Sequence, residues 1–189
     1  MPTLDRIDLR CLLDDSNVIL AAESPSGICG GPESVGVDFL AAISDLSLRE
    51  LYRMIISRVR ETGQTLTFHL RCDTAELRRL SFVRIGRGRH DGRDCLEVVN
   101  GTLDERPHAT RLALLDPAVP HSPDFLTICS WCKQVKLAGD RWVEVEQAMH
   151  ELHLFQQPTL PGLTHGMCPA CAERLRAEFA RQVAEGKGR

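Results

Sequence analysis

The chain has 189 residues, of which 43% are hydrophobic and 26% charged, with eight cysteines and a formal net charge of −3. These values are typical of a globular protein with one hydrophobic core and a smaller module. The chain is not basic enough for nucleic-acid binding to be its default function. The N-terminal segment carries acidic residues and no long apolar run follows, so we expect no signal peptide, no membrane span and a cytoplasmic location.

The first predicted element is a β-hairpin. Apolar and polar residues alternate over 7–13, the Asp-Asp-Ser-Asn turn at 14–17 follows, and 18–21 is apolar again. Residues 23–45 are rich in Gly, Pro and Ser and predict loops and short helices. A capping box at Ser47 and Glu50 then opens an apolar stripe that stops at Gly63, which predicts one long helix.

Three strand-like runs follow this helix, over residues 65–72, 77–87 and 95–103. In the first run, apolar residues alternate with polar ones as a half-buried strand requires. A two-stranded start, one long helix and a three-stranded meander predict an α+β fold, an antiparallel sheet with helices on one face.

The order of these elements over residues 1–107 resembles a PAS domain. The resemblance is carried by the 14–17 turn, the helix end Glu61-Thr62-Gly63-Gln64, the strand Thr67-Phe68-His69-Leu70-Arg71 and the segment Gly101-Thr102-Leu103-Asp104-Glu105-Arg106. That last segment is similar to the closing motif of many PAS domains. The chain departs from the pattern at 73–75, where Asp-Thr-Ala replaces the usual Asp-Gly turn.

The resemblance implies a sensor or docking domain with an apolar pocket, whose ligand it does not identify. Hydrophobic residues on the first two strands of the meander are the candidate pocket lining: Leu66, Phe68, Leu70, Leu80 and Phe82. Residues 108–124 contain three prolines and are predicted as a linker to the rest of the chain.

Residues 125–189 contain two Cys-x-x-Cys knuckles, which predict a metal site formed by Cys129, Cys132, Cys168 and Cys171. Two such turns supply the tetrahedral sulfur set that Zn²⁺ prefers, and the closed set indicates a structural ion. His165 is a competing ligand only three residues before the second knuckle. A duplicated motif outside a βαβ setting argues against a thioredoxin-like redox pair.

The segment between the knuckles predicts a hairpin over 136–142 and an amphipathic helix of about three turns over 145–155. Pro169 favours a helix that starts at the second knuckle, where the partial positive charge of the helix end stabilises thiolates. This order resembles a treble-clef zinc finger with an extra helix. Because a small module buries little apolar surface, we expect its fold to depend on the metal and to be nearly uncoupled from residues 1–107.

A PAS-like domain followed by this cysteine pattern is similar to chains found in bacterial signalling proteins. The resemblance implies protein partners, and we expect a homodimer that acts by protein–protein contact, without membrane or nucleic-acid binding. The chain contains no catalytic motif that would indicate an enzyme. Two alternatives stay open: a zinc-dependent nucleic-acid-binding transcriptional regulator that uses the arginine-rich hairpin at 78–93 or the C-terminal helix, and a thiol redox switch.

Overall fold

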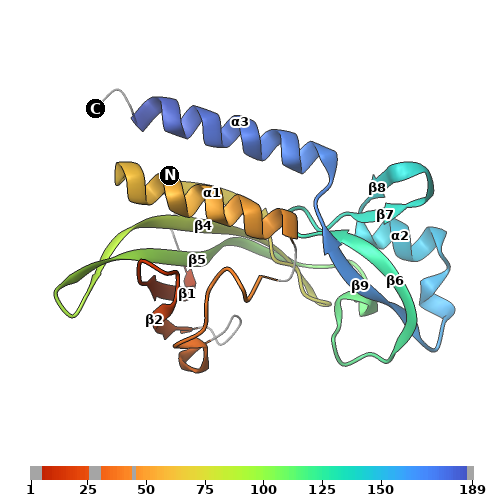
Figure 1. The fold of residues 1–189 in the computed structure, drawn as a ribbon. Helices are drawn as coiled ribbons and strands as arrows, with labels where there is room; N and C mark the ends of the chain where they lie inside the picture. Colours follow the sequence, from red (N-terminus) through yellow and green to blue (C-terminus); the bar gives the residue numbers. More distant parts are fainter. Residues whose placement is uncertain (1–5, 26–30, 44–45, 187–189) are drawn as a thin grey trace.

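The computed structural model of the chain describes residues 6–25, 31–43 and 46–186 (Figure 1). Its first sheet is antiparallel throughout and has the strand order β2-β1-β5-β4-β3. The strands of this sheet are β1 (Arg6–Leu13), β2 (Ile19–Glu23), β3 (Leu66–Arg71), β4 (Leu77–His90) and β5 (Arg93–Pro107). The α+β class predicted for this part of the chain is therefore confirmed.

The second sheet has the order β8-β7-β6-β9 and mixes antiparallel pairs with one parallel pair, β6 with β9. Its strands are β6 (His121–Cys129), β7 (Val135–Leu137), β8 (Arg141–Val143) and β9 (Leu160–Gly166). The helices are α1 (Leu46–Thr62), α2 (Val145–Glu151) and α3 (Pro169–Gly186), with short 3-10 turns η1 (Pro32–Ser34), η2 (Ala113–Leu115), η3 (Ala138–Asp140) and η4 (Leu154–Gln156). In the described ranges, no helix combines the length and apolar character needed to cross a membrane.

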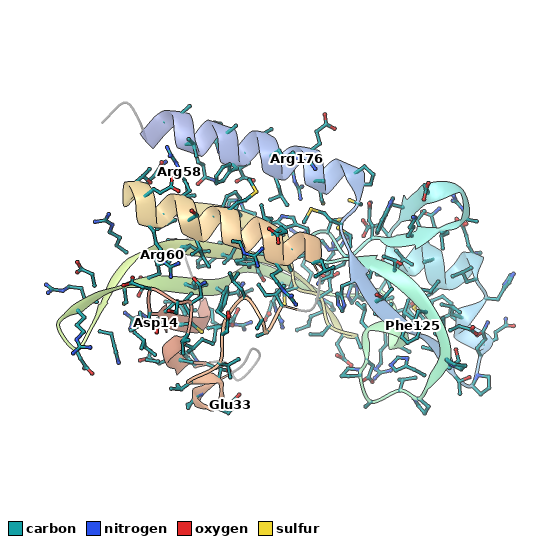
Figure 2. All side chains as sticks on the ribbon, in the orientation of Figure 1. Asp14, Glu33, Arg58, Arg60, Phe125 and Arg176 are labelled. Atoms are coloured by element: carbon teal, nitrogen blue, oxygen red, sulfur yellow. The ribbon has the colours of Figure 1, made fainter. Side chains whose placement is uncertain are left out.

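The opening hairpin forms as predicted, with β1 paired to β2. Its turn is fixed by Asp14, whose Oδ1 accepts hydrogen bonds of 2.8 Å from the backbone N–H groups of Ser16 and Val18. Asn17 takes the left-handed conformation, with φ of 67°, that short polar residues tolerate. Arg60 of α1 donates a hydrogen bond to the Asp14 carbonyl at 2.7 Å and so joins the helix to this turn (Figure 2).

Helix α1 covers one face of the first sheet with the apolar stripe that the sequence predicted. Ile55, Ile56 and Val59 are buried against strand residues that include Leu66, Phe68, Val83, Ile85, Leu96 and Val98. The helix ends at Gly63, whose φ of 68° suits glycine and whose N–H donates to the Val59 carbonyl at 2.8 Å. The side chain of Ser47, and with it the predicted capping box, lies outside the described residues.

The pairing of β3 with β4 separates the five predicted pocket residues. Phe68 lies opposite Val83, whereas Phe82 lies opposite His69 and Leu80 opposite Arg71. Neighbouring side chains of a strand point to opposite faces, so Leu80 and Phe82 lie on the face away from Leu66, Phe68 and Leu70. Leu80 is 42% exposed. The prediction that all five line one pocket is therefore corrected.

Residues 108–124, predicted as a linker, are packed structure. Leu112 and Leu114 are buried in a second core, formed between α2 and the second sheet. The Leu112 N–H donates to the Ala75 carbonyl at 2.8 Å, and the His108 N–H donates to the Glu76 carbonyl at 2.9 Å. The 3-10 turn η2 and the first residues of β6 lie in this segment, so it joins the two sheets closely.

The predicted hairpin at 136–142 forms as β7 and β8, and the predicted helix at 145–155 is shorter than expected. Helix α2 ends at Glu151, because His153 takes a φ of 54° and turns the chain into η4. Leu152, just after the helix, still packs against the second core, whereas Phe155, at the end of the predicted helix, is 50% exposed.

The metal-site cysteines do not form a separate core. Cys129, Cys168 and Cys171 belong to the same buried cluster as the α1 and β3 residues, together with Trp131 and Leu175. Helix α3 runs alongside α1, and residues of both helices line one groove (Figure 1). We expected residues 125–189 to fold almost independently of residues 1–107. Instead, apolar residues of the C-terminal module pack in the same core as α1 and the first sheet.

We predict that Phe68→Ala lowers the free energy of unfolding by about 3–5 kcal/mol, because the fully buried ring leaves a cavity. Leu80→Ala is the matched control on the opposite, partly exposed face and is expected to lower it by less than about 1 kcal/mol. Urea unfolding of the full chain measures both values. Equal losses for the two variants would show that the assignment of faces is wrong.

Candidate metal centre

The two knuckles meet because β6 and β9 run in parallel. Their pairing ends with Cys129 opposite Gly166, so Cys168, two residues further along, arrives beside the first knuckle. Ser130 N–H donates to the Gly166 carbonyl at 2.8 Å and fixes this approach. Cys171 follows in the first turn of α3.

The first knuckle is a tight turn between β6 and β7. Lys133 has a φ of 64°, and its N–H donates to the Cys129 carbonyl at 3.0 Å. The Cys129 N–H in turn donates to the Gln134 carbonyl at 2.7 Å, which closes the turn around Cys132. This geometry turns both sulfur atoms of the knuckle to the same side.

The four Sγ atoms of Cys129, Cys132, Cys168 and Cys171 all lie within 4.8 Å of one another. The Sγ atoms of Cys132 and Cys168 are 3.7 Å apart, which is far longer than a disulfide bond. A tetrahedral Zn²⁺ ion with Zn–S bonds of about 2.3 Å sets neighbouring sulfurs about 3.8 Å apart. The donor set therefore fits one tetrahedral ion, as predicted from the spacing.

Hydrogen-bond donors surround the sulfur atoms. The Cys168 N–H points at Cys129 Sγ and the Cys171 N–H at Cys168 Sγ, each at 3.4 Å. The Arg174 guanidinium lies 3.5 Å from Cys171 Sγ. Because four thiolates and Zn²⁺ carry a net charge of about −2, these donors and the positive end of α3 stabilise the metal-bound form.

Without a metal, Cys129, Cys132 and Cys171 have thiol pKa values shifted in different directions. Hydrogen bonds from the Cys132 thiol and from backbone N–H groups lower the pKa of Cys129 to about 4. Cys132, as the donor of that bond, has its pKa raised, and burial raises the pKa of Cys171 to about 12. Full ionisation of the set therefore requires a cation.

The protein buries three of the four sulfur atoms. Cys129, Cys168 and Cys171 are buried, and Cys132 is half-buried at the rim of a pocket of about 270 Å³ that Leu70 and Leu80 also border. His165 is exposed on β9 and lies outside the group of four sulfurs. A complete set of four thiolates holds an ion as a structural element.

Trp131, between the two ligands of the first knuckle, is the functional residue that the sequence analysis missed. Its ring is buried and meets Phe68 of β3 edge to face, with the ring centroids 6.4 Å apart. Its Nε1–H donates to the His69 carbonyl at 2.6 Å. A large apolar residue between two predicted metal ligands could have indicated that the knuckle packs against another part of the protein.

Comparisons of the chain with protein-family models, curated proteins and solved structures gave no match.

We predict that Cys168→Ser abolishes the stoichiometric binding of zinc, because a serine hydroxyl replaces a buried thiolate ligand. His165→Ala is the matched control from the same segment and should retain one zinc per chain. Native mass spectrometry of the two variants measures metal content directly. Retention of zinc by Cys168→Ser, or loss of zinc from His165→Ala, would show that the ligand set is wrong.

We also predict that binding of Zn²⁺ at pH 7 releases at least two protons per ion, one each from Cys132 and Cys171, whose thiol pKa values are raised. Calorimetric titration in buffers of different ionisation enthalpy counts the protons. Release of one proton or fewer would contradict this order of acidities.

Proposed function

We propose that this chain is a bacterial signalling protein in which a PAS-like sensor or docking domain is stabilised by a structural zinc centre and acts through contact with other proteins. The observation that supports it best is the position of the four thiolates. They are gathered within 4.8 Å and packed into the core under α1 and β3. Metal in that position stabilises a scaffold.

The donor set also argues against a metalloenzyme. A catalytic zinc keeps one coordination position for water or substrate, whereas four cysteines occupy every position of a tetrahedral ion. The order of elements supports the PAS-like assignment, since a hairpin, one long helix and a three-stranded meander form one antiparallel sheet. Because the five predicted pocket residues lie on two faces, docking is favoured over binding of a ligand in that pocket.

The arginine-rich hairpin gives little support to the nucleic-acid alternative. Arg79 is buried and pairs with Glu105 at 3.2 Å, and Arg78 lies 3.6 Å from Glu144. Arg89 lies 3.8 Å from Asp94. Carboxylates thus partner three of the six arginines of the hairpin, so the hairpin offers less free positive charge to phosphates than its arginine count alone indicates.

The redox alternative has one structural observation in its favour. Cys132 is half-buried and borders a pocket, so a small oxidant has a path to one zinc ligand. Zinc release by mild peroxide, reversed by a reductant, distinguishes a thiol switch from a purely structural centre.

The proposal is tested by affinity capture from bacterial lysate with the zinc-loaded chain and with Cys168→Ser as baits, followed by reconstitution of the complex from purified components. A partner that binds the zinc-loaded chain at least about tenfold more tightly supports a zinc-stabilised docking protein. Partners that bind both baits equally would argue against a role for the metal.

We predict no useful retention of mixed duplex DNA at about 0.15 M salt, because a net charge of −3 lacks the counterion-release contribution that dominates such binding. A gel shift with random genomic fragments is the measurement, and a known basic DNA-binding protein serves as the positive control. Sub-micromolar retention would favour the transcriptional regulator instead.

A further inference from the structure

Strand β3 is an edge strand of the first sheet, and its free side is covered by the C-terminal module. An uncovered edge presents backbone N–H and C=O groups of alternate residues, which pair readily with another strand. Gln182 of α3 satisfies both groups of Thr67. Its Oε1 accepts from the Thr67 N–H at 2.9 Å, and its Nε2 donates to the Thr67 carbonyl at 2.6 Å.

Trp131 covers the rest of the same edge. Its indole N–H donates to the His69 carbonyl at 2.6 Å, and its backbone carbonyl accepts from the Arg71 N–H at 2.8 Å. The groups of Thr67, His69 and Arg71 therefore point outward. By alternation, Leu66, Phe68 and Leu70 form the hydrogen bonds to β4.

Gln182 and Trp131, the two residues that cover the β3 edge, are both close in sequence or structure to the metal centre. Trp131 lies between the ligands Cys129 and Cys132, and Gln182 lies on the helix that begins between Cys168 and Cys171. The pairing of β6 with β9 already brings the two knuckles together, and the four thiols form no disulfide, so a shared ion would be the bond that fixes Trp131 and the start of α3 to one point. The opposite edge of the sheet differs: the Ile19 N–H of β2 donates to the Val37 carbonyl at 2.9 Å, a local contact that needs no metal.

Strand β3 has little protection of its own. It contains neither proline nor lysine, and its register with β4 is regular throughout. The positive charge of Arg71 is neutralised by Asp73, which belongs to the first sheet and stays beside Arg71 when the C-terminal module, with Glu144, moves away. Once the C-terminal module moves away, the edge is open along its length.

We propose that the metal centre acts as a clamp on the β3 edge, and that loss of the metal frees this edge to pair with β3 of a second copy of the chain. This inference rests on the proposed zinc site. Metal occupancy would then switch one surface between a covered state and a self-associated state, in addition to any oligomer that the zinc-loaded chain forms.

A second copy fits this edge by symmetry and charge. An antiparallel pair centred on His69 places Thr67 of each chain opposite Arg71 of the other, so the arginines do not oppose each other. The same register places Phe68 opposite Leu70 on the apolar face that Trp131 covers in the zinc-loaded chain. Both strands are uncovered by the same event, so self-pairing needs no other partner.

Residue-resolved hydrogen exchange on the full chain, zinc-loaded or treated with EDTA, tests the clamp. In dilute EDTA-treated protein, the amides of Thr67 and Arg71 should exchange at least about tenfold faster than in the zinc-loaded chain. The amides of Phe68 and Leu70 should keep their protection, because they bond to β4. At high concentration the Thr67 and Arg71 protection should return while light scattering shows the mass doubling.

Two variants sharpen the test. His69→Pro removes an outward N–H at the centre of the proposed pair and should bind zinc normally but fail to double in mass after EDTA treatment. Gln182→Ala should accelerate exchange at Thr67 and leave Arg71 unchanged with zinc bound. Arg181→Ala, one residue away and exposed, is its control and should leave both amides unchanged.

The outcomes separate the two proposals. A chain that carries zinc but whose Thr67 and Arg71 amides do not respond to EDTA overturns the clamp and leaves the structural zinc centre standing. Loss of protection at Phe68 and Leu70 together with Thr67 also overturns it, because the whole sheet then depends on the metal. A purified chain without stoichiometric zinc overturns the proposed function itself.

Discussion

Four cysteine sulfurs that lie within 4.8 Å of one another cannot all be ionised unless a cation lies among them. The remainder of the C-terminal half depends on this constraint. One knuckle closes the turn after β6, the other begins α3, and the two are connected mainly through their shared site and the parallel pairing of β6 with β9. Because the knuckles also carry Trp131 and α3 into the first core, an ion bound there would stabilise both sheets and not only its own module.

The sequence predicts those features of the fold that depend on neighbouring residues, and it fails for those that depend on long-range pairing. Alternation located the strands, and Gly63 and Pro169 marked where α1 ends and α3 begins. The register of β4 could not be predicted. Leu80 and Phe82 on one face recur with the same period of two as Val83 and Ile85 on the other. Only the long-range pairing of β3 with β4 decides which of these sets faces α1. The three prolines within 108–124 led to the prediction of a linker, although this segment is packed into the second core.

The candidate site shows the same division. Cys-x-x-Cys spacing is a local signal, so all four ligands could be predicted, and the structure brings them together. The contacts of Trp131 and Gln182 with β3 join residues far apart in the chain, and no spacing rule indicates them. A buried tryptophan within a knuckle predicts that the knuckle packs against something. The sequence does not say that this surface is the edge of another sheet.

The separation of Thr67 and Gln182 by 115 residues has a consequence for biosynthesis. A ribosome adds about 5–20 residues per second, so roughly 6–23 seconds pass between synthesis of the strand and synthesis of the residue that covers it. A small sheet domain folds in milliseconds to seconds. The first sheet is incomplete until β5 ends at Pro107, so a formed sheet would present an open β3 edge only while the next 75 residues (182 − 107) are made, and neighbouring nascent chains on one polysome would expose the same strand together. Cys171 is the last of the four ligands to be made, so the vulnerable period ends only after metal can be captured.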